Sequence, residues 1–506
     1  MLLLQSCDAK LRKLFDLATF IPEKLMIKDI FKDEICRVLG LTPTEEQAAA
    51  IDVFSSFATC PDSRSVMILS GSAGTGKTSL AGAIVRAMEN MRQKVVLMAP
   101  TGRAAKVFSL NAGSEAGTIH RRIYRQKTYA GEDTAFSLNF NKHRDTLFIV
   151  DEASMITSGN GAASIFGSGS LLDDLMQYVY GGERCRLMLT GDKAQLPPVG
   201  ETESPALSPQ VIGGYGVKVF TADLNEVLRQ GAGSGILWNA TAIRRMITHD
   251  EVTQMPRITL SGFPDIRLVP GNELTDELGS SYSSVGTDET MVVTRSNKRA
   301  NIHNNGIRRM ILWREEPLES GDLLMVVKNN YHWTATEDGG SDERQPMAFL
   351  ANGDRMVVRR VRNTRVLHGF TFADAQLVFP DYGDHEVEAT VLLDTLQAES
   401  PALTREQRER LFNAVMDDYA DIPRKSERLK KVRGDRFYNA LQIKYAYAVT
   451  CHKAQGGQWA HVYIDQGYMT SDMLSPDYIH WLYTAFTRAT ERLFLINWPQ
   501  EQVGEE

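Results

Sequence analysis

Residues 71–78 of the chain read Gly-Ser-Ala-Gly-Thr-Gly-Lys-Thr, which is a complete match to the pattern GxxxxGK[ST]. The stretch follows the apolar run SVMILS (65–70) and precedes SLAGAIVRAMENM (79–91), where apolar residues recur every three or four positions. A strand, a glycine-rich turn and a helix in this order predict a loop whose backbone N–H groups surround phosphate oxygens. The alternative is a glycine-rich turn with a surface lysine, and the flanking strand and helix disfavour it.

The residues of this loop suit the binding of ATP. Glycine at 71, 74 and 76 lets the backbone turn inward where a side chain would block a phosphate. Lys77 would supply a point charge to the β and γ phosphates, and the Thr78 hydroxyl would ligate Mg²⁺. The predicted nucleotide-binding residues of the loop are Gly71, Ser72, Ala73, Gly74, Thr75, Gly76, Lys77, Thr78 and Ser79.

Two adjacent carboxylates, Asp151 and Glu152, directly follow the apolar run TLFIV (146–150). An acidic pair after a strand is a weak signal by itself, and its position after a phosphate loop strengthens it. We expect Asp151 to hold Mg²⁺, directly or through water, and Glu152 to polarise the attacking water as a general base. The predicted cofactors are therefore ATP and Mg²⁺.

Gln47 lies in the stretch LTPTEEQ (41–47) ahead of the loop, and two roles fit it. Thr44 and Gln47 have the spacing of a capping box, in which the glutamine would stabilise a helix start. A glutamine amide is also both a donor and an acceptor, as the edge of adenine requires. The pattern leaves these two interpretations about equal.

The fold class follows from apolar runs that alternate with helical patterns. The runs at 65–70, 94–99, 146–150 and 186–190 are nearly continuous, which is typical of parallel strands covered on both faces. Short β-like runs separated by turns lie between about 326 and 440 and predict a small inserted barrel. The charged stretch 404–431 is expected to be a helical excursion with a solvated face. The expected parts are an N-terminal helical segment (1–40), a first α/β domain (41–220), a second α/β domain (221–325 and 441–506) and the insertion (326–440).

The composition excludes several classes of protein. The 506 residues include 56 Lys and Arg and 63 Asp and Glu, so a net charge of −7 disfavours polyanion binding by bulk charge alone. No apolar run approaches the roughly 20 residues that span a bilayer, so no membrane partner is expected. The five cysteines are scattered and contain no CxxC pair, which favours a reducing compartment and a cytoplasmic location.

Further motifs follow the loop in a fixed order and resemble those of superfamily 1 helicases, above all the RecD-like and Dda-like DNA helicases of the 5′-to-3′ branch. The resemblance implies two RecA-like P-loop NTPase domains with parallel sheets, an SH3-like β-barrel in the second and a β-hairpin pin in the first. The motifs are MAPTGRAAKVF (98–108), TIH (118–120), DEAS (151–154), GDKAQLPPVG (191–200), LNEVLRQ (224–230), VTCHKAQGGQW (449–459) and LYTAFTRATERL (482–493).

The resemblance also implies roles for residues around the nucleotide. Gln195, which follows Asp192, would sense the γ-phosphate. Arg229 and Arg488 would reach that phosphate from the second domain and stabilise the charge that develops during phosphoryl transfer. Helix-surface salt bridges are the alternative role of these two arginines. Gly457 and Gln458 would face the phosphates, so the implied catalytic set is Lys77, Asp151, Glu152, Gln195, Arg229 and Arg488.

In this family, side chains at known motif positions contact the sugar-phosphate backbone of the DNA strand. The matching residues here are Thr101, Lys106, His120, Thr450, His452 and Lys453, with Thr294, Arg295 and Asn297 as weaker candidates. Phosphate contacts of this kind carry no sequence information. Structural histidines are the alternative for His120 and His452. Trp333, Tyr331 and Trp459 are candidate platforms for base stacking, although aromatic residues lie more often in a core.

Residues 124–141 show alternation broken by Ala-Gly and read as a β-hairpin. The resemblance implies that this hairpin is the pin that splits an incoming duplex, with Phe136 or Tyr129 stacked on the last base pair. An ordinary surface hairpin is the alternative. We also expect a monomer that acts on single-stranded DNA and on junctions of single and double strands.

Three functions fit the sequence. The first is an ATP-dependent DNA helicase that translocates 5′ to 3′ on single-stranded DNA and unwinds duplexes. The others are a RecD-type motor subunit of a larger nuclease or recombination complex, and a DNA-stimulated translocase that does not unwind. The setting would be DNA repair, recombination or replication, with proteins of those pathways as candidate partners. The intact Lys77, Asp151 and Glu152 disfavour a motor without activity.

Overall fold

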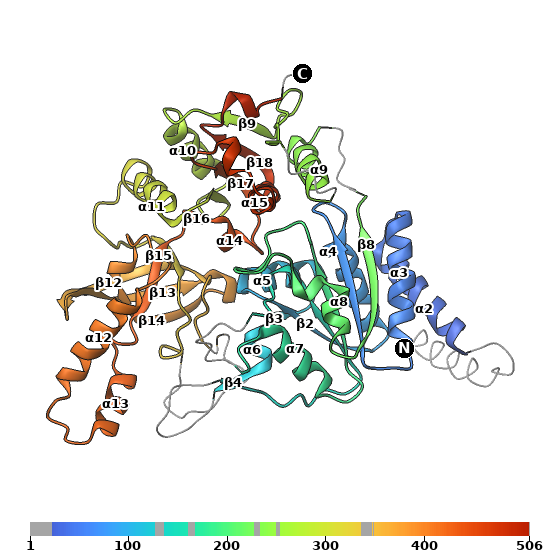
Figure 1. Cartoon of the computed structure of the whole chain (residues 1–506), viewed down its shortest axis with the longest axis horizontal. Coiled ribbons are helices and arrows are strands. Elements are labelled where there is room, and N and C mark those ends of the chain that lie inside the picture. The colour runs from blue at the N-terminus through green and yellow to red at the C-terminus, as the bar shows by residue number, and fades with distance from the viewer. Residues whose placement is uncertain are drawn as a thin grey trace, which may run out of the picture.

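The computed structural model of the chain describes residues 23–126, 136–159, 167–226, 233–248, 254–334, 347 and 349–504. Within them lie two parallel sheets and a closed barrel (Figure 1). The α/β class with two parallel-sheet domains and a five-stranded barrel is therefore confirmed. In the described ranges, no helix has the length and apolar composition that crossing a membrane requires.

The first lobe is built on a six-stranded parallel sheet of order β3-β2-β6-β7-β1-β8. Its strands are β1 (Ser65–Gly71), β2 (Lys94–Ala99), β3 (Ala116–Thr118), β6 (Thr146–Val150), β7 (Arg186–Gly191) and β8 (Lys218–Leu224). The runs that predicted buried strands are buried as expected, β1 and β6 along their whole length. β8 continues to Leu224, so the first sheet extends past residue 220, where we expect the first domain to end.

Helices and one short ribbon surround this sheet. The helices are α2 (Glu23–Leu39), α3 (Glu45–Ala58), α4 (Lys77–Asn90), α5 (Gly102–Ala112), α6 (Ile119–Ile123), α7 (Leu171–Tyr180) and α8 (Pro209–Gly213). Two antiparallel strands, β4 (Tyr124–Gln126) and β5 (Phe136–Leu138), form the base of the predicted hairpin. Tyr129 lies outside the described residues.

The second lobe has a five-stranded parallel sheet of order β16-β10-β17-β18-β9. Its strands are β9 (Ile266–Val269), β10 (Thr290–Thr294), β16 (Ala448–Thr450), β17 (Trp459–Asp465) and β18 (Ala489–Ile496). Its helices are α9 (Gly235–Thr248), α10 (Leu274–Ser284), α11 (Asn297–Gly306), α14 (Cys451–Ala454) and α15 (Pro476–Phe486). Because β16 follows the barrel in the chain, the barrel is an insertion within this lobe.

The barrel closes in the order β11-β12-β13-β14-β15. Its strands are β11 (Leu323–Val326), β12 (Arg355–Leu367), β13 (Phe370–Phe379), β14 (His385–Leu392) and β15 (Leu441–Tyr445). The charged excursion forms α12 (Arg405–Asp418) and α13 (Lys425–Gly434). Their faces are not wholly solvated, because Leu411, Val415 and Val432 pack on Phe370 and Phe372 of the barrel.

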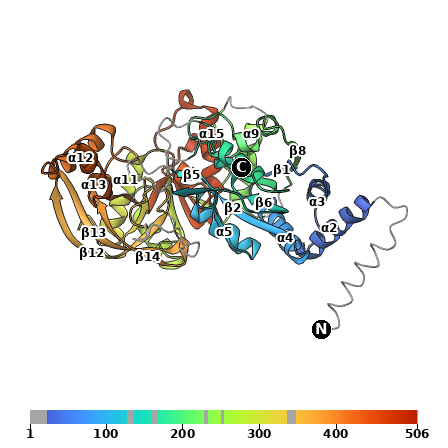
Figure 2. The same ribbon diagram turned by 90° about the horizontal axis from the view of Figure 1, so that it is seen from below.

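The barrel and the first lobe meet at a short helical turn after β13, Pro380–Tyr382. A Cβ on Gly102 of α5 would lie 2.6 Å from the Tyr382 hydroxyl oxygen, so a larger residue there would displace the Tyr382 ring. Figure 2 shows the barrel with α12 and α13 at one end of the molecule and α2 and α3 at the other. The helix α5 therefore lies at a junction between parts of the chain far apart in sequence.

Candidate nucleotide site and nucleic-acid groove

The phosphate loop connects β1 to α4. Gly74 and Gly76 have φ angles of 81° and 77°, in the left-handed region that glycine adopts without strain. Gly71 has no room for a side chain, since a Cβ would lie 2.9 Å from Thr75 Oγ1. The Lys77 ammonium donates to the Gly71 carbonyl at 3.0 Å, so it lies over the loop. This arrangement holds the loop's N–H groups at the start of a helix, where an anion is favoured.

Sheet order brings the two acidic positions to the loop. β6, β7 and β1 are neighbours, and the carboxyl ends of parallel strands meet at one edge of a sheet. Asp151 follows β6 and accepts a hydrogen bond from the Thr190 hydroxyl. Asp192 follows β7, is fully buried and accepts from the Ala194 N–H at 3.0 Å. Both carboxylates therefore have fixed orientations beside the loop.

Glu152 lies at the same edge and has a strained backbone and a buried carboxylate. Its backbone is left-handed, with a φ of 52°, which is strained for a side chain of this size. Its Oε2 is buried and has no hydrogen-bond partner among the described residues. Burial raises the pKa of Glu152, Arg488 and Lys77 oppose that shift, and Asp151 and Asp192 add to it. A buried carboxylate with a raised pKa under the influence of two cations is suited to act as a base.

Two glutamines lie near the loop. Gln195 is buried, and its Oε1 has no hydrogen-bond partner in the described part of the chain. Gln47 completes the capping box with Thr44 and also donates from Nε2 to the Thr75 carbonyl at 3.4 Å. The structural role of Gln47 is thus present, and contact with a nucleotide base stays a prediction.

The second lobe presents Arg488 to this site. Only 2% of its surface is exposed, and it donates to the carbonyls of Thr484 and Gly457, both at 3.0 Å. These bonds hold the guanidinium where its charge acts on Glu152 of the other lobe. The alternative of a helix-surface salt bridge does not describe this environment. Arg488 is buried, and its acceptors among the described residues are two carbonyls and the Thr487 hydroxyl. Arg229 lies in 227–232, outside the described residues.

The loop after β7 joins the lobes directly. The Leu196 N–H donates to Thr484 Oγ1 at 2.8 Å, and Gln455 Nε2 donates to the Leu196 carbonyl at 2.7 Å. His480 contacts the Ala194 carbonyl at 2.9 Å. These bonds connect α15 to the segment that carries Asp192 and Gln195.

A groove of about 660 Å³ lies between the two lobes and the barrel. Among its lining residues are Thr101, Arg103, Arg295, Asn297, Lys298, Arg355, Glu399, Thr450, His452 and Lys453. The two lobes and the barrel thus bring five cationic side chains and one carboxylate to one surface. This local excess of positive charge suits a phosphate backbone, although the chain as a whole is acidic.

Lys453 is a cation held partly out of water in this groove. Burial and the neighbouring Lys444 lower its pKa to about 8. Burial also lowers the pKa of Lys444, on β15, to about 8. Two ammonium groups kept together at low solvation favour an anion between or beside them.

Of the six candidate DNA contacts taken from the family motifs, Lys106 and His120 lie outside the groove. The other four line it. Lys106 donates to the Pro380 carbonyl at 2.9 Å and pairs with Asp381 at 3.6 Å, so its ammonium serves the contact with the barrel. His120 packs against the rings of Tyr124 and Phe349. Burial lowers the pKa of His120 to about 4, which keeps the ring neutral. Neither residue lines the groove, and the structural interpretation fits His120.

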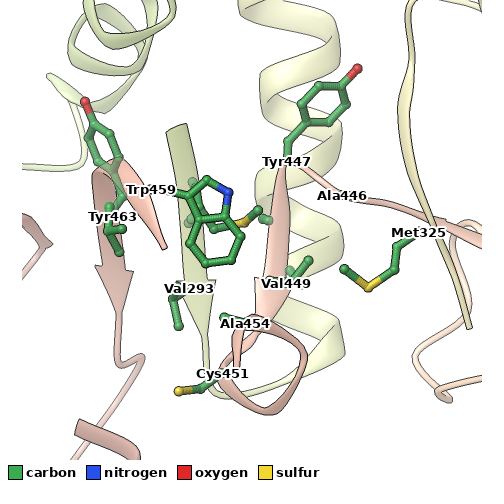
Figure 3. Packing of buried hydrophobic residues seen from close by; sticks show 14 of the residues in the cluster. Val293, Met325, Ala446, Tyr447, Val449, Cys451, Ala454, Trp459 and Tyr463 are labelled. Carbon is green, nitrogen blue, oxygen red and sulfur yellow. The ribbon is translucent and has the colours of Figure 1, made fainter. Parts of the chain in front are cut away.

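The aromatic candidates belong mainly to the core. Trp459 is 2% exposed and lies among the buried side chains of the second lobe (Figure 3). The Arg103 guanidinium covers its ring, 4.6 Å from the centroid. Trp333 donates to the Asn439 carbonyl at 2.9 Å, and Tyr331 packs on Phe349 with ring centroids 5.0 Å apart. Trp459 also lines the groove, and base stacking by any of the three rings stays a prediction.

Sequence reasoning missed Arg103, Arg355 and Tyr483. Arg103 follows Thr101 in the TGR stretch (101–103), so its place beside a candidate DNA contact was a usable signal. It also donates to the Gln458 carbonyl at 2.5 Å across the lobes. Arg355 begins β12 of the barrel, and only the folding of the barrel onto the groove brings it there.

The fold and the site together define a P-loop nucleoside triphosphatase with two RecA-like lobes that meet at the nucleotide site. Residues 41–255 match the AAA domain family, and residues 445–496 match the UvrD-like helicase C-terminal domain. In both matched parts the chain is similar to superfamily 1 helicases of the RecD type.

Relatives match along most of the chain. An uncharacterized protein of Methanocaldococcus jannaschii is 24% identical over 94% of this chain and 40% of its own length. The ATP-dependent RecD2 DNA helicase of Deinococcus radiodurans is 25% identical over 89% of this chain and 48% of its own length. Our chain thus spans less than half of both proteins. A Pif1 helicase from Bacteroides, in complex with ADP-AlF3 and single-stranded DNA, covers 92% of this chain at 15% identity and a TM-score of 0.43.

Proposed function

We propose that this chain is an ATP-dependent DNA helicase that moves 5′ to 3′ along single-stranded DNA and opens duplexes. The observation that carries the proposal is that charges of both lobes, Lys77 of the first and Arg488 of the second, act on the buried carboxylate of Glu152. Hydrolysis that needs groups from both lobes is coupled to the distance between the lobes. The direction of movement rests on the family resemblance, and one relative is a DNA helicase by name.

The residues present fit ATP with Mg²⁺. Buried oxygens without partners in the described ranges, Glu152 Oε2 and Gln195 Oε1, lie in the loops beside the phosphate loop and can accept bonds from an attacking water. Thr78 and Asp151 would hold the metal, which neutralises phosphate charge when bound. Lys77 and Arg488 would orient the phosphates and offset the charge that develops. Glu152 would take the proton of the attacking water.

The groove would hold the strand. Thr101 on the first lobe and Thr450 and His452 on the second line the same surface, so each lobe can contact the backbone. Phosphate contacts from hydroxyl and imidazole groups do not depend on base identity. Alternating grip by the two lobes, timed by closure around ATP, would move the chain along DNA. The hairpin β4–β5 would separate the strands, with Phe136 as the proposed contact.

A strand-displacement assay tests this function and separates it from its rivals. We expect ATP-dependent opening of a duplex with a 5′ single-stranded tail and no opening of one with a 3′ tail. Opening of the 3′-tailed duplex alone would contradict the direction. If neither opens while DNA still stimulates ATP turnover, the chain is a translocase that does not unwind. Co-elution with nuclease subunits from a cell extract would favour the motor-subunit alternative.

The lowered pKa of Lys453 predicts a pH dependence of DNA binding. Below pH 8, Lys453 of the free protein is mostly protonated and carries its positive charge. Above pH 8 it is mostly neutral, so DNA binding must be accompanied by the uptake of a proton at Lys453. Affinity for single-stranded DNA should therefore fall about tenfold between pH 7 and pH 9. Lys453→Arg keeps its charge over this range and should lose most of that dependence. Fluorescence anisotropy at constant ionic strength measures the affinity at each pH. Equal pH slopes for the wild type and Lys453→Arg would contradict a DNA contact by Lys453.

A further inference from the structure

Tyr483, on α15 of the second lobe, reaches across to the phosphate loop. Its hydroxyl oxygen accepts a hydrogen bond from the Ala73 N–H at 3.1 Å. The same hydroxyl donates to Asp192 Oδ2 at 2.6 Å. The side chain is 1% exposed, so neither bond is shared with solvent. One phenol from the second lobe thus joins two catalytic segments of the first.

The direction of these bonds is set by Asp192. Its Oδ1 accepts from the Ala194 N–H, and its Oδ2 takes the phenol proton. Because the phenol gives its proton to a carboxylate, its oxygen is left with lone pairs for the Ala73 N–H. A hydrogen bond between a hydroxyl and an ionised group is also stronger than a neutral one. The phenol is therefore held firmly against the loop.

The same helix carries the arginine. Thr484, next to Tyr483, accepts from the Leu196 N–H through Oγ1, and its carbonyl accepts from Arg488 Nε at 3.0 Å. Arg488 lies just beyond the end of α15 at Phe486. Any shift of Tyr483 relative to the loop is consequently a shift of the Arg488 guanidinium relative to Glu152.

The Ala73 N–H belongs to the loop whose N–H groups would bind phosphate. A phosphate oxygen is charged and competes for such a donor better than a phenol oxygen does. A bound nucleotide and the Tyr483 hydroxyl therefore compete for the same N–H group of the phosphate loop. We propose that Tyr483 is a positioning residue through which the second lobe follows the state of the phosphate loop. This inference rests on the proposed function. It adds the residue that links the state of the phosphate loop to the second lobe.

Tyr483→Phe tests the inference, because it removes the hydroxyl and keeps the ring that fills the core. Loss of a bond to a charged group should lower DNA-stimulated kcat about tenfold to a hundredfold. Affinity for a fluorescent ADP should be unchanged or up to about threefold higher, because the phenol no longer competes for the Ala73 N–H. Slower turnover without weaker binding is a result that general loss of structure does not produce.

Tyr478→Phe is the matched control on the same helix. Tyr478 is also buried, and its hydroxyl donates to Gln466 Oε1 at 2.6 Å within the second lobe. We expect turnover within about twofold of wild type for this variant, although it too loses a buried hydrogen bond. Wild-type turnover in Tyr483→Phe would overturn the inference, as would equal losses of turnover and ADP affinity.

A double-mutant cycle tests whether Asp192 acts through Tyr483. Asp192→Asn removes the charge that orients the phenol, so its effect on turnover should not add to that of Tyr483→Phe. Additive effects would overturn the connection between the two residues. A wild-type protein that shows no DNA-stimulated turnover would overturn the proposed function itself, whereas normal wild-type turnover with a neutral Tyr483→Phe overturns only this inference.

Discussion

Lys77→Ala will lower ATP turnover by at least about a hundredfold, the scale on which removal of one preorganised charge-stabilising group acts. The Lys77 ammonium donates to the Gly71 carbonyl, and the side chain is only partly buried. Truncation therefore removes the positive charge over the loop and little packing. Steady-state phosphate release with and without single-stranded DNA measures the effect.

The control for this variant is a lysine at the opposite edge of the same sheet. Lys94 begins β2 and is exposed, so Lys94→Ala should keep wild-type turnover. Thermal unfolding of both variants should match wild type within a few degrees, since substitutions of exposed side chains typically change stability by less than about 0.5 kcal/mol. Turnover by Lys77→Ala within a factor of two of wild type would remove the nucleotide site from this loop.

Arg488→Ala is expected to lower turnover by about 10³- to 10⁵-fold, the range for arginines that stabilise phosphoryl transfer. Nucleotide affinity should change far less, because Lys77 and the loop's N–H groups stay in place. Arg488 is buried and makes bonds within its own lobe, so loss of stability has to be measured alongside. Arg488→Lys keeps a charge and cannot reproduce the bonds to both carbonyls, so its turnover should be intermediate.

The pH dependence of turnover separates a catalytic role of Arg488 from a structural one. Burial raises the pKa of Glu152, and the Arg488 charge opposes that rise. A base must be deprotonated to act, so turnover falls as pH drops through the pKa of Glu152. Removing Arg488 should move this acidic limb to higher pH. An unshifted limb in Arg488→Ala, or turnover within tenfold of wild type, would contradict the proposed contact.

Much of the nucleotide site was predictable because its chemistry is local. The phosphate loop needs glycines, a lysine and a hydroxyl at fixed spacing between a strand and a helix, and the chain shows all of these together at 71–78. Asp151 and Glu152 directly follow an apolar run that is recognisable as a strand in the sequence. The parallel sheet was predictable for a similar reason. Runs such as 147–150 are apolar at every position, which is typical of strands covered on both faces.

The groove shows where motif reasoning falls short. Thr101 and Lys106 come from one motif, yet only Thr101 lines the groove. Lys106 lies farther along α5 and meets Asp381 of the barrel, whose position no local pattern predicts. His120 likewise belongs to a recognised motif and lies against Phe349, which is more than two hundred residues later in the chain. The charged side chains of the barrel that share the groove, such as Arg355, carry no sequence signal at all.

By itself, the amino-acid sequence determined the class of fold, the phosphate loop, the two adjacent carboxylates and the arginine beyond α15. Each is a property of neighbouring residues, which the covalent chain holds together before any folding. The tertiary structure alone decided which cations share the groove, that Trp459 is covered by Arg103, and that Tyr483 meets Ala73. These contacts join residues hundreds of positions apart. They depend on how three packed bodies fit together, and packing is a property of complete surfaces rather than of any one stretch of sequence.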